Sequence, residues 1–193
     1  MAQSSRVEVP WLVLFALAVV MTIAVIVGIM LCMLSQAFFS GTEMAMVNAD
    51  RVRLEARSSE GHAGAALALR FIHNEEKLLG TCLMGTNLSV VSGATLMAYL
   101  LGMHGVEAAF WAAVVFTPIA LVFGEALPKT VFEYHSTAIA PYLAWPLRGA
   151  QLLFALPLFI VSAWGSLLAL LFGSRTPAPA TREDIVGLLE GEA

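Results

Sequence analysis

The chain has 193 residues, of which 59% are hydrophobic and 12% charged, and its formal net charge is -4. Soluble domains carry about 25% charged residues, so this composition, with a mean hydropathy of +0.82, indicates a membrane protein. The acidic balance and the lack of a basic cluster exclude nucleic-acid binding. The long apolar blocks exclude a water-soluble enzyme, and we expect the chain to face a lipid bilayer.

Four apolar stretches are long enough to cross that bilayer, for which a helix needs about 20 residues. The first three predict spans at about 11–39, 80–103 and 108–128. The first stretch is too long for a signal peptide and has no small-residue cleavage pattern behind a short apolar core, so we interpret it as a retained helix.

The charges of the connecting loops predict the orientation. The loop 48–77 is basic, whereas the connection 102–107 has no Lys or Arg, so the positive-inside rule places the loop in the cytoplasm and the N-terminus outside. Within the loop, Asn48 can cap a helix that ends near Gly61, and 63–72 has a second helical pattern, which together predict a cytoplasmic helical hairpin. The five basic residues are Arg51, Arg53, Arg57, Arg70 and Lys77.

A fourth apolar stretch, 149–174, leaves two arrangements open. Its hydropathy favours another crossing, whereas the nearby Pro141 and Pro146 suit short helices at the membrane interface. We expect a juxtamembrane belt over about 136–173, with the C-terminus in the cytoplasm. Residues 175–193 are interpreted as a linker followed by the start of an acidic helix.

Few polar side chains lie inside the predicted spans. An ionised group there costs about 2.5–3.5 kcal/mol on insertion scales, so each needs a partner or a function. In the predicted topology they all lie toward the cytoplasmic half. Hydroxyl, amide and carboxylate oxygens without His or Cys favour Mg²⁺ or another hard cation over zinc or copper. The residues are Ser40, Glu43, Thr86, Asn87, Ser89 and Glu125.

The third span contains a helix breaker next to its acidic residue. Pro128 has no N–H to donate to Gly124, four residues earlier, and its ring collides with that carbonyl. A kinked helix would then present the Gly124 carbonyl beside the Glu125 carboxylate. Gly85 permits a similar close approach of backbone next to Asn87.

Structural interpretations of the same residues stay open. Ser40, Thr86 and Ser89 can bond back to helix carbonyls, and Asn87 can hydrogen-bond between helices. Glu43 can be an interfacial residue at the end of a long helix. The row Gly85, Ser89 and Gly93 has the spacing of a helix–helix contact.

Three motifs in this order resemble the transmembrane domain of the CorC/CNNM (cyclin-M) magnesium transporters. They are Phe38-Phe39-Ser40-Gly41-Thr42-Glu43, Gly85-Thr86-Asn87-Leu88, and Phe123-Gly124-Glu125-Ala126-Leu127-Pro128. Two departures are visible. Many members have Asn directly after the glycine of the second motif, and a larger aliphatic residue is usual at the position of Ala126.

The resemblance implies an all-α, homodimeric membrane protein with three transmembrane helices per chain and a belt, residues 1–174 forming the transmembrane domain. It implies a protein of the cell membrane that binds a largely dehydrated Mg²⁺ in a cytoplasmic-side cavity of its membrane domain. A cytoplasmic CBS-domain pair is expected after the acidic helix. Carried over by motif, the metal ligands are Ser40, Asn87 and Glu125, with backbone oxygens of Gly85 and Gly124, Glu43 as an acidic wall, and Pro128 as the kink.

Two function classes follow from these residues and the resemblance. The first is a Mg²⁺ transporter, with export and coupling to Na⁺ as what the resemblance implies. The alternative is a Mg²⁺-sensing membrane scaffold that regulates a partner without conducting. A membrane-embedded enzyme is not expected, because the sequence offers no nucleophile–base pair.

Overall fold

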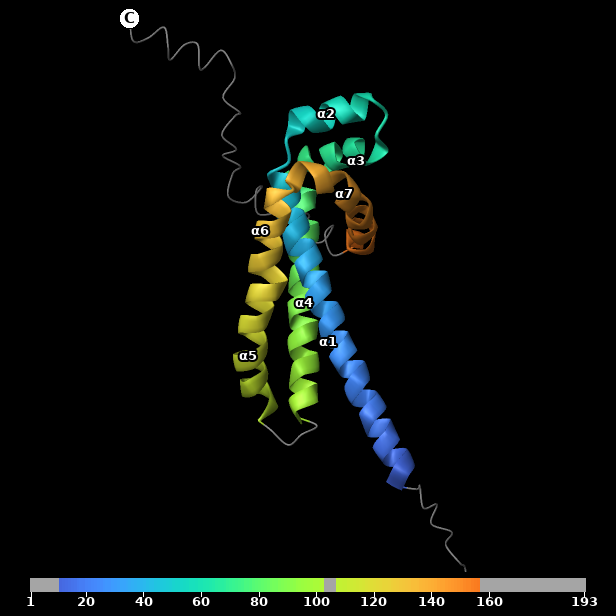
Figure 1. The fold of residues 1–193 in the computed structure, drawn as a ribbon, viewed down its shortest axis with the longest axis vertical. Coiled ribbons are helices and arrows are strands. Elements are labelled where there is room, and N and C mark those ends of the chain that lie inside the picture. Colours follow the sequence, from blue (N-terminus) through green and yellow to red (C-terminus); the bar gives the residue numbers. More distant parts are fainter. Residues whose placement is uncertain (1–10, 103–106, 157–193) are drawn as a thin grey trace, which may run out of the picture. The chain divides into compact units, whose positions relative to one another are not determined.

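The computed structural model describes residues 11–102 and 107–156 of the chain (Figure 1). Every regular element in these two ranges is a helix, as the sequence predicts. Within the described residues, three helices are long and apolar enough to cross a membrane, and they correspond to the three predicted spans. They are α1 (Trp11–Val47), α4 (Glu75–Gly102), and a composite third span over Phe110–Tyr134.

The composite span changes helix type along its length. It consists of α5 (Ala108–Ile119), the π-helix η1 (Ala120–Ala126) and α6 (Leu127–Tyr134). Pro118 lies near the end of α5 and Pro128 in the first turn of α6, so the π-helix is bounded by two residues that cannot donate a backbone hydrogen bond. The irregular backbone predicted near Pro128 is therefore a π-helical segment.

The helix α1 continues beyond the expected end of its apolar stretch. It ends at Val47 rather than near residue 39, because no proline follows Phe39, Gly41 is buried against the Phe132 ring, and the next helix is capped only at Asp50. The Asp50 side chain accepts a hydrogen bond from the Arg53 N–H (3.2 Å), whereas the predicted cap, Asn48, donates to the Met44 carbonyl (3.0 Å). Asn48 thus belongs to the end of α1.

Two short helices occupy the basic loop, α2 (Arg51–Ser59) and α3 (Ala63–Ile72). Gly61 has φ +92°, and the Gly61 and His62 N–H groups donate to the Ser58 and Arg57 carbonyls (3.0 and 3.1 Å). This is the Schellman pattern that ends a helix, and it turns the chain from α2 into α3. The cytoplasmic position of both helices stays a prediction.

The helix α7 (Ser136–Leu153) occupies the first half of the predicted belt and packs beside α3 (Figure 1). Its start is tied to the α1–α2 junction by two hydrogen bonds, Ser136 Oγ to the Asn48 carbonyl (3.0 Å) and the Asp50 N–H to Thr137 Oγ1 (2.9 Å). The second half of the belt and the segment 175–193 lie outside the described residues.

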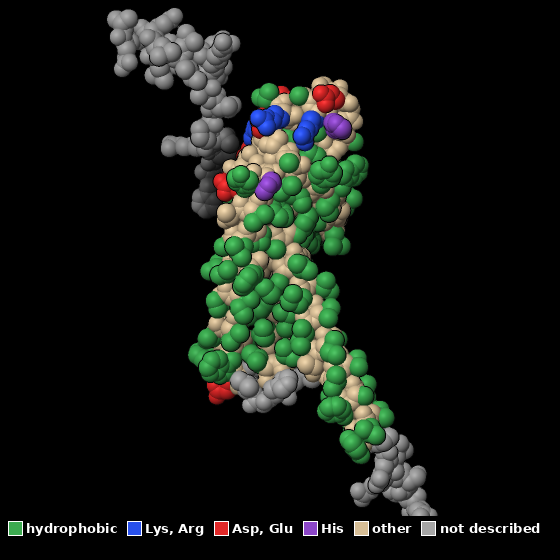
Figure 2. All heavy atoms as spheres, in the orientation of Figure 1, with side chains coloured by type: hydrophobic (Ala, Val, Ile, Leu, Met, Phe, Trp, Pro, Cys, Tyr) green, Lys and Arg blue, Asp and Glu red, His purple; other side chains and the backbone are tan. Residues whose placement is uncertain are grey.

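Hydrophobic side chains cover the spans, and Lys and Arg gather at the end that carries α2 and α3 (Figure 2). The small core between the spans consists of Val25, Ile29, Phe116 and Ala120. The first two turns of α1 are exposed throughout, as expected for a helix that faces lipid.

Candidate functional site

The small-residue row of α4 packs against other helices of the same chain. A Cβ on Gly85 would overlap the Phe39 ring of α1, and one on Gly93 would stand 2.5 Å from the Phe116 ring of α5. Between them, the Ser89 hydroxyl is 2.9 Å from the Ser35 hydroxyl of α1. The row therefore seats α1 and α5 on α4 within one chain.

An adjacent side of α1 meets the π-helix through Gln36 and Gly124. The buried Gln36 amide donates from Nε2 to the Ala120 carbonyl (3.3 Å). A Cβ on Gly124 would stand 2.5 Å from Gln36 Oε1, so only glycine leaves room for this amide. Glycine at 124 thus acts by letting a polar side chain lie against the backbone of η1.

Three buried side-chain oxygens of α1 have no hydrogen-bond partner among the described residues: Gln36 Oε1, Ser40 Oγ and Thr42 Oγ1. Buried polar atoms are nearly always paired, so three of them within two helical turns call for an explanation. Other hydroxyls of the spans bond back to the carbonyl four residues earlier, at 2.7 to 3.0 Å. These are Thr22, Thr81, Ser89, Thr95 and Thr130.

The structural interpretation of Ser89 is therefore confirmed, since its hydroxyl bonds back to the Gly85 carbonyl (2.7 Å). Ser40 shows no such bond in the described part of the chain, although its Oγ is buried. The Ser89 hydroxyl is thus used in a hydrogen bond within α4, whereas the Ser40 oxygen has no partner in the described residues and is available to a ligand.

Gln36, Ser40 and Glu43 are spaced at i, i+4 and i+7, so they form one stripe along α1, which we call the α1 stripe. Its first member touches the π-helix at Gly124. Glu43 is half-buried, and its carboxylate lies within electrostatic range of Cys82 on α4. The stripe therefore begins against the third span and ends near α4.

Glu125 follows Gly124 on the π-helix and forms an ion pair with Lys129 (Oε1 to Nζ, 2.9 Å). Both side chains are about one-third exposed, at 38% and 33%. Partly exposed pairs of this i, i+4 type are worth only about 0.3–0.5 kcal/mol, so the lysine can be displaced. At the end of η1 the N–H of Leu127 donates to Val122, five residues earlier.

Asn87 lies apart from this group within one chain. Its side chain is exposed, two residues along α4 from Gly85, which is buried against Phe39. Residues two apart on a helix point in widely different directions, so the amide does not face α1. The structure brings Gln36 against Gly124, with Ser40 one turn further along α1, and it leaves Asn87 on the other side of α4.

Gln36 and the buried hydroxyl of Thr42 are the members that the sequence interpretation missed. Gln36 is an uncharged amide one turn before Ser40, and that spacing inside an apolar span was the available signal. In the sequence, Thr42 stands out only as a member of the first motif. Both become visible once their buried oxygens are seen to lack partners in the described ranges.

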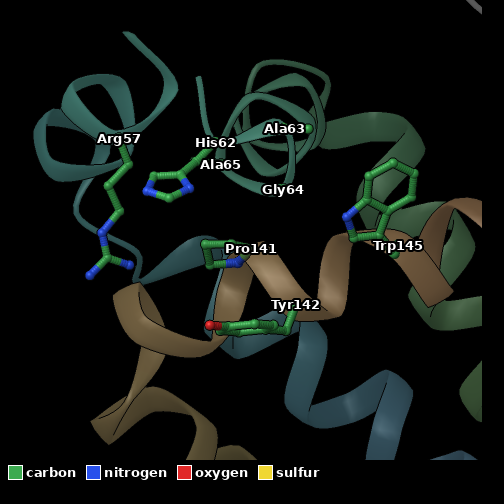
Figure 3. A pocket seen from close by; sticks show the side chains of 8 residues that line it. All are labelled: Arg57, His62, Ala63, Gly64, Ala65, Pro141, Tyr142 and Trp145. Atoms are coloured by element: carbon green, nitrogen blue, oxygen red, sulfur yellow. The ribbon is translucent and has the colours of Figure 1, made fainter. Parts of the chain in front are cut away.

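A pocket of about 430 Å³ lies elsewhere, between the α2–α3 turn and α7 (Figure 3). The figure shows Arg57 and His62 on one wall and Pro141, Tyr142 and Trp145 on the other. None of the predicted metal ligands lines it. In the described ranges, no three His, Cys, Asp or Glu side chains are grouped to hold a metal, so a cation site here would rest mainly on neutral oxygens.

The chain is similar in sequence to several membrane-family proteins from bacteria. The chain is 28% identical over 142 residues to the UPF0053 inner membrane protein YfjD of Escherichia coli, a match that covers 72% of the chain and 33% of YfjD. It is 31% identical over 114 residues to a UPF0053 protein of Haemophilus influenzae, covering 58% and 27%. It is 30% identical over 169 residues to a UPF0053 protein of Synechocystis, covering 79% and 38%.

The chain therefore spans about a third of the length of these curated relatives. The sequence profile of the Cyclin M transmembrane N-terminal domain matches residues 26–193, which is most of the chain. The match includes the end of α1, the whole of α4 and the π-helix. The chain belongs to the family of the Cyclin M (CNNM) transmembrane N-terminal domain.

Proposed function

We propose that this chain is the membrane domain of a Mg²⁺ transporter and that Mg²⁺ is held by oxygens between α1 and the π-helix. The observation that carries the proposal is the pair of buried oxygens of the α1 stripe, Gln36 Oε1 and Ser40 Oγ, that lack partners in the described residues. Family membership and the resemblance of the three motifs support the choice of Mg²⁺ as the transported ion.

The donor set fits a hard cation. Mg²⁺ takes oxygen ligands in near-octahedral geometry at about 2.0–2.1 Å and keeps waters where the protein offers few ligands. Gln36 Oε1 and Ser40 Oγ are neutral and buried, whereas Glu125 supplies negative charge once Lys129 is displaced. Neutral oxygens replace part of the water shell of Mg²⁺ but hold the ion less tightly than carboxylates do. A transported ion can therefore both bind and leave.

The remaining candidate ligands differ in burial and in the hydrogen bonds that they already make. Gly124 would offer its carbonyl beside the Gln36 amide, and Glu43 would form an acidic wall at the end of the α1 stripe. The Gly85 carbonyl already accepts the Ser89 N–H within α4 and the Ser89 hydroxyl, so it ranks low as a metal ligand. Asn87 ranks below Gln36 as the amide ligand, because its side chain is exposed on the other side of α4.

The proposal extends to the setting of the domain in the cell membrane. The basic loop that forms α2 and α3 favours a cytoplasmic position, which places the N-terminus outside. By resemblance, two chains form a homodimer, export Mg²⁺ in exchange for Na⁺, and carry a cytoplasmic CBS-domain pair after residue 193. A transporter rather than an enzyme is the activity we assign.

Flux through reconstituted protein tests this function. The purified chain is placed in liposomes that contain a Mg²⁺-sensitive dye, and a Mg²⁺ gradient is applied with and without an opposing Na⁺ gradient. The proposal predicts Mg²⁺ movement that the variant Ser40→Ala abolishes and the matched variant Ser89→Ala retains. Tight Mg²⁺ binding with no flux under either gradient would contradict transport and favour the Mg²⁺-sensing scaffold.

A further inference from the structure

A second pocket, of about 250 Å³, lies where α3, the start of α4 and α7 meet. It is lined by Leu67, Arg70, Phe71, Asn74, Lys77, Arg148 and Gln151. Three of these residues are cationic and none is acidic. Each cation comes from a different helix, so the cluster is made by the fold and is not a run in the sequence.

None of the three cations has an ion-pair partner in the described part of the chain. The ion pairs there join Arg51 to Glu75, Arg53 to Asp50 and Lys129 to Glu125. Glu75, which is close in sequence to Lys77, is therefore occupied by Arg51 of α2. Like charges that converge without a carboxylate repel one another, and a bound anion removes that repulsion.

The other lining groups suit a phosphate. Asn74 and Gln151 carry amide N–H donors, and arginine presents paired N–H groups that match phosphate oxygens. Leu67 and Phe71 are buried and give the pocket an apolar wall. An anion with a hydrocarbon part fits these surroundings better than a wholly polar one.

The level of the pocket along the molecule favours a lipid as the source of that phosphate. Lys77 lies in the first turn of α4, where a candidate membrane span begins. Trp145 precedes Arg148 by three residues on α7 and is 55% exposed, as is typical of aromatic residues at the headgroup level. Leu152 and Leu153, which follow Gln151, are also exposed and available to acyl chains.

We propose that the Arg70–Lys77–Arg148 pocket binds the phosphate headgroup of an anionic phospholipid. The lipid would join α3 and α7 to the start of α4 through one anion. This site is separate from the proposed Mg²⁺ site, since its residues include none of the α1 stripe or the π-helix. Either proposal can therefore fail without the other.

The test uses the full chain, purified in detergent, and titrated with phosphatidylglycerol, phosphatidylcholine or inorganic phosphate. Bound lipid is counted by native mass spectrometry, and the melting temperature is recorded for each titration. The site variant is Arg70→Gln, Lys77→Gln, Arg148→Gln, in which all three exposed cations are removed. The control removes two cations of α2 and keeps Arg51, so that Glu75 stays paired: Arg53→Gln, Arg57→Gln.

We expect phosphatidylglycerol, and neither phosphatidylcholine nor phosphate, to bind and raise the melting temperature of the wild-type chain. The site variant should bind it at least about tenfold more weakly, because each basic residue contributes to anionic lipid attraction. The α2 control should keep wild-type binding. Equal loss in both variants, equal binding of both lipids, or stabilisation by inorganic phosphate alone would overturn the proposal.

Discussion

The Gln36 amide oxygen lies 2.5 Å from the point where a Cβ on residue 124 would stand. A long polar side chain of α1 therefore occupies the space left by a missing side chain on the π-helix. The same amide donates to Ala120, one turn earlier on the third span, so a hydrogen bond and a close approach fix α1 against η1 together. Ser40 follows on the same side of α1.

The variant Gly124→Ala tests that relationship. An added methyl group forces the flexible end of Gln36 away from η1 and breaks its hydrogen bond to the Ala120 carbonyl, which costs about 0.5–1.5 kcal/mol. We expect a lower melting temperature in detergent and weaker Mg²⁺ binding by calorimetry. The matched control is Gly149→Ala on α7, where no atom lies within 4 Å of the added Cβ. A Gly124→Ala chain as stable as the control would contradict the contact.

The ion pair Glu125–Lys129 predicts an increase in affinity. Lys129→Gln removes the cation that competes with Mg²⁺ for the Glu125 carboxylate. Because a partly exposed i, i+4 pair is worth about 0.3–0.5 kcal/mol, the dissociation constant for Mg²⁺ should fall by about twofold. Arg53→Gln, which frees Asp50 on α2, should leave it unchanged. Weaker binding by Lys129→Gln would show that the lysine positions the carboxylate.

Pro128→Ala probes the role of the π-helix. Alanine restores a backbone N–H at residue 128 and permits regular α-helical bonding, which turns Gly124 and Glu125 away from their present direction. Mg²⁺ affinity should fall about tenfold or more, as when the supporting structure around a metal is lost. Pro146→Ala within α7 is the control. Wild-type affinity in Pro128→Ala would show that the π-helix is independent of this proline.

Gly93→Leu separates helix packing from metal binding. The new side chain collides with the Phe116 ring of the same chain, so the melting temperature should drop, with a cost of about 1–3 kcal/mol. The dissociation constant for Mg²⁺ and the fraction of dimer in detergent should stay as in the wild type. A selective loss of dimer without a change in melting temperature would place the row at an interface between chains.

Much of the fold could be predicted because the membrane makes long apolar runs obligatory. The number of spans and the bounds of the helix Ala63–Ile72 follow from composition and periodicity. The end of α1 could not be predicted in this way, because the polar residues after Phe39 remain helical when neighbouring helices bury them. The choice of Asp50 over Asn48 as the cap depends on local backbone geometry that two adjacent cap-forming residues do not distinguish.

The candidate site was predictable only in part. Ser40, Gly124 and Glu125 follow from the cost of burying polar groups and from the position of Pro128. Gln36 did not, because its role depends on a contact with Gly124 across the two helices. The row Gly85, Ser89 and Gly93 indicates a packed side of α4, but its spacing does not tell which helix packs there, so the position of Asn87 relative to α1 could not be predicted.

Calorimetric titration of Mg²⁺ into the double variant Gln36→Leu, Ser40→Ala tests the central claim most directly. Both substitutions remove buried oxygens that lack partners in the described residues while keeping an apolar or small side chain in place. The control, Ser89→Ala with Thr95→Val, removes two oxygens that already bond to helix carbonyls. The account predicts that the double variant loses measurable Mg²⁺ binding and that the control binds as the wild type does. Wild-type affinity in the double variant would contradict the account.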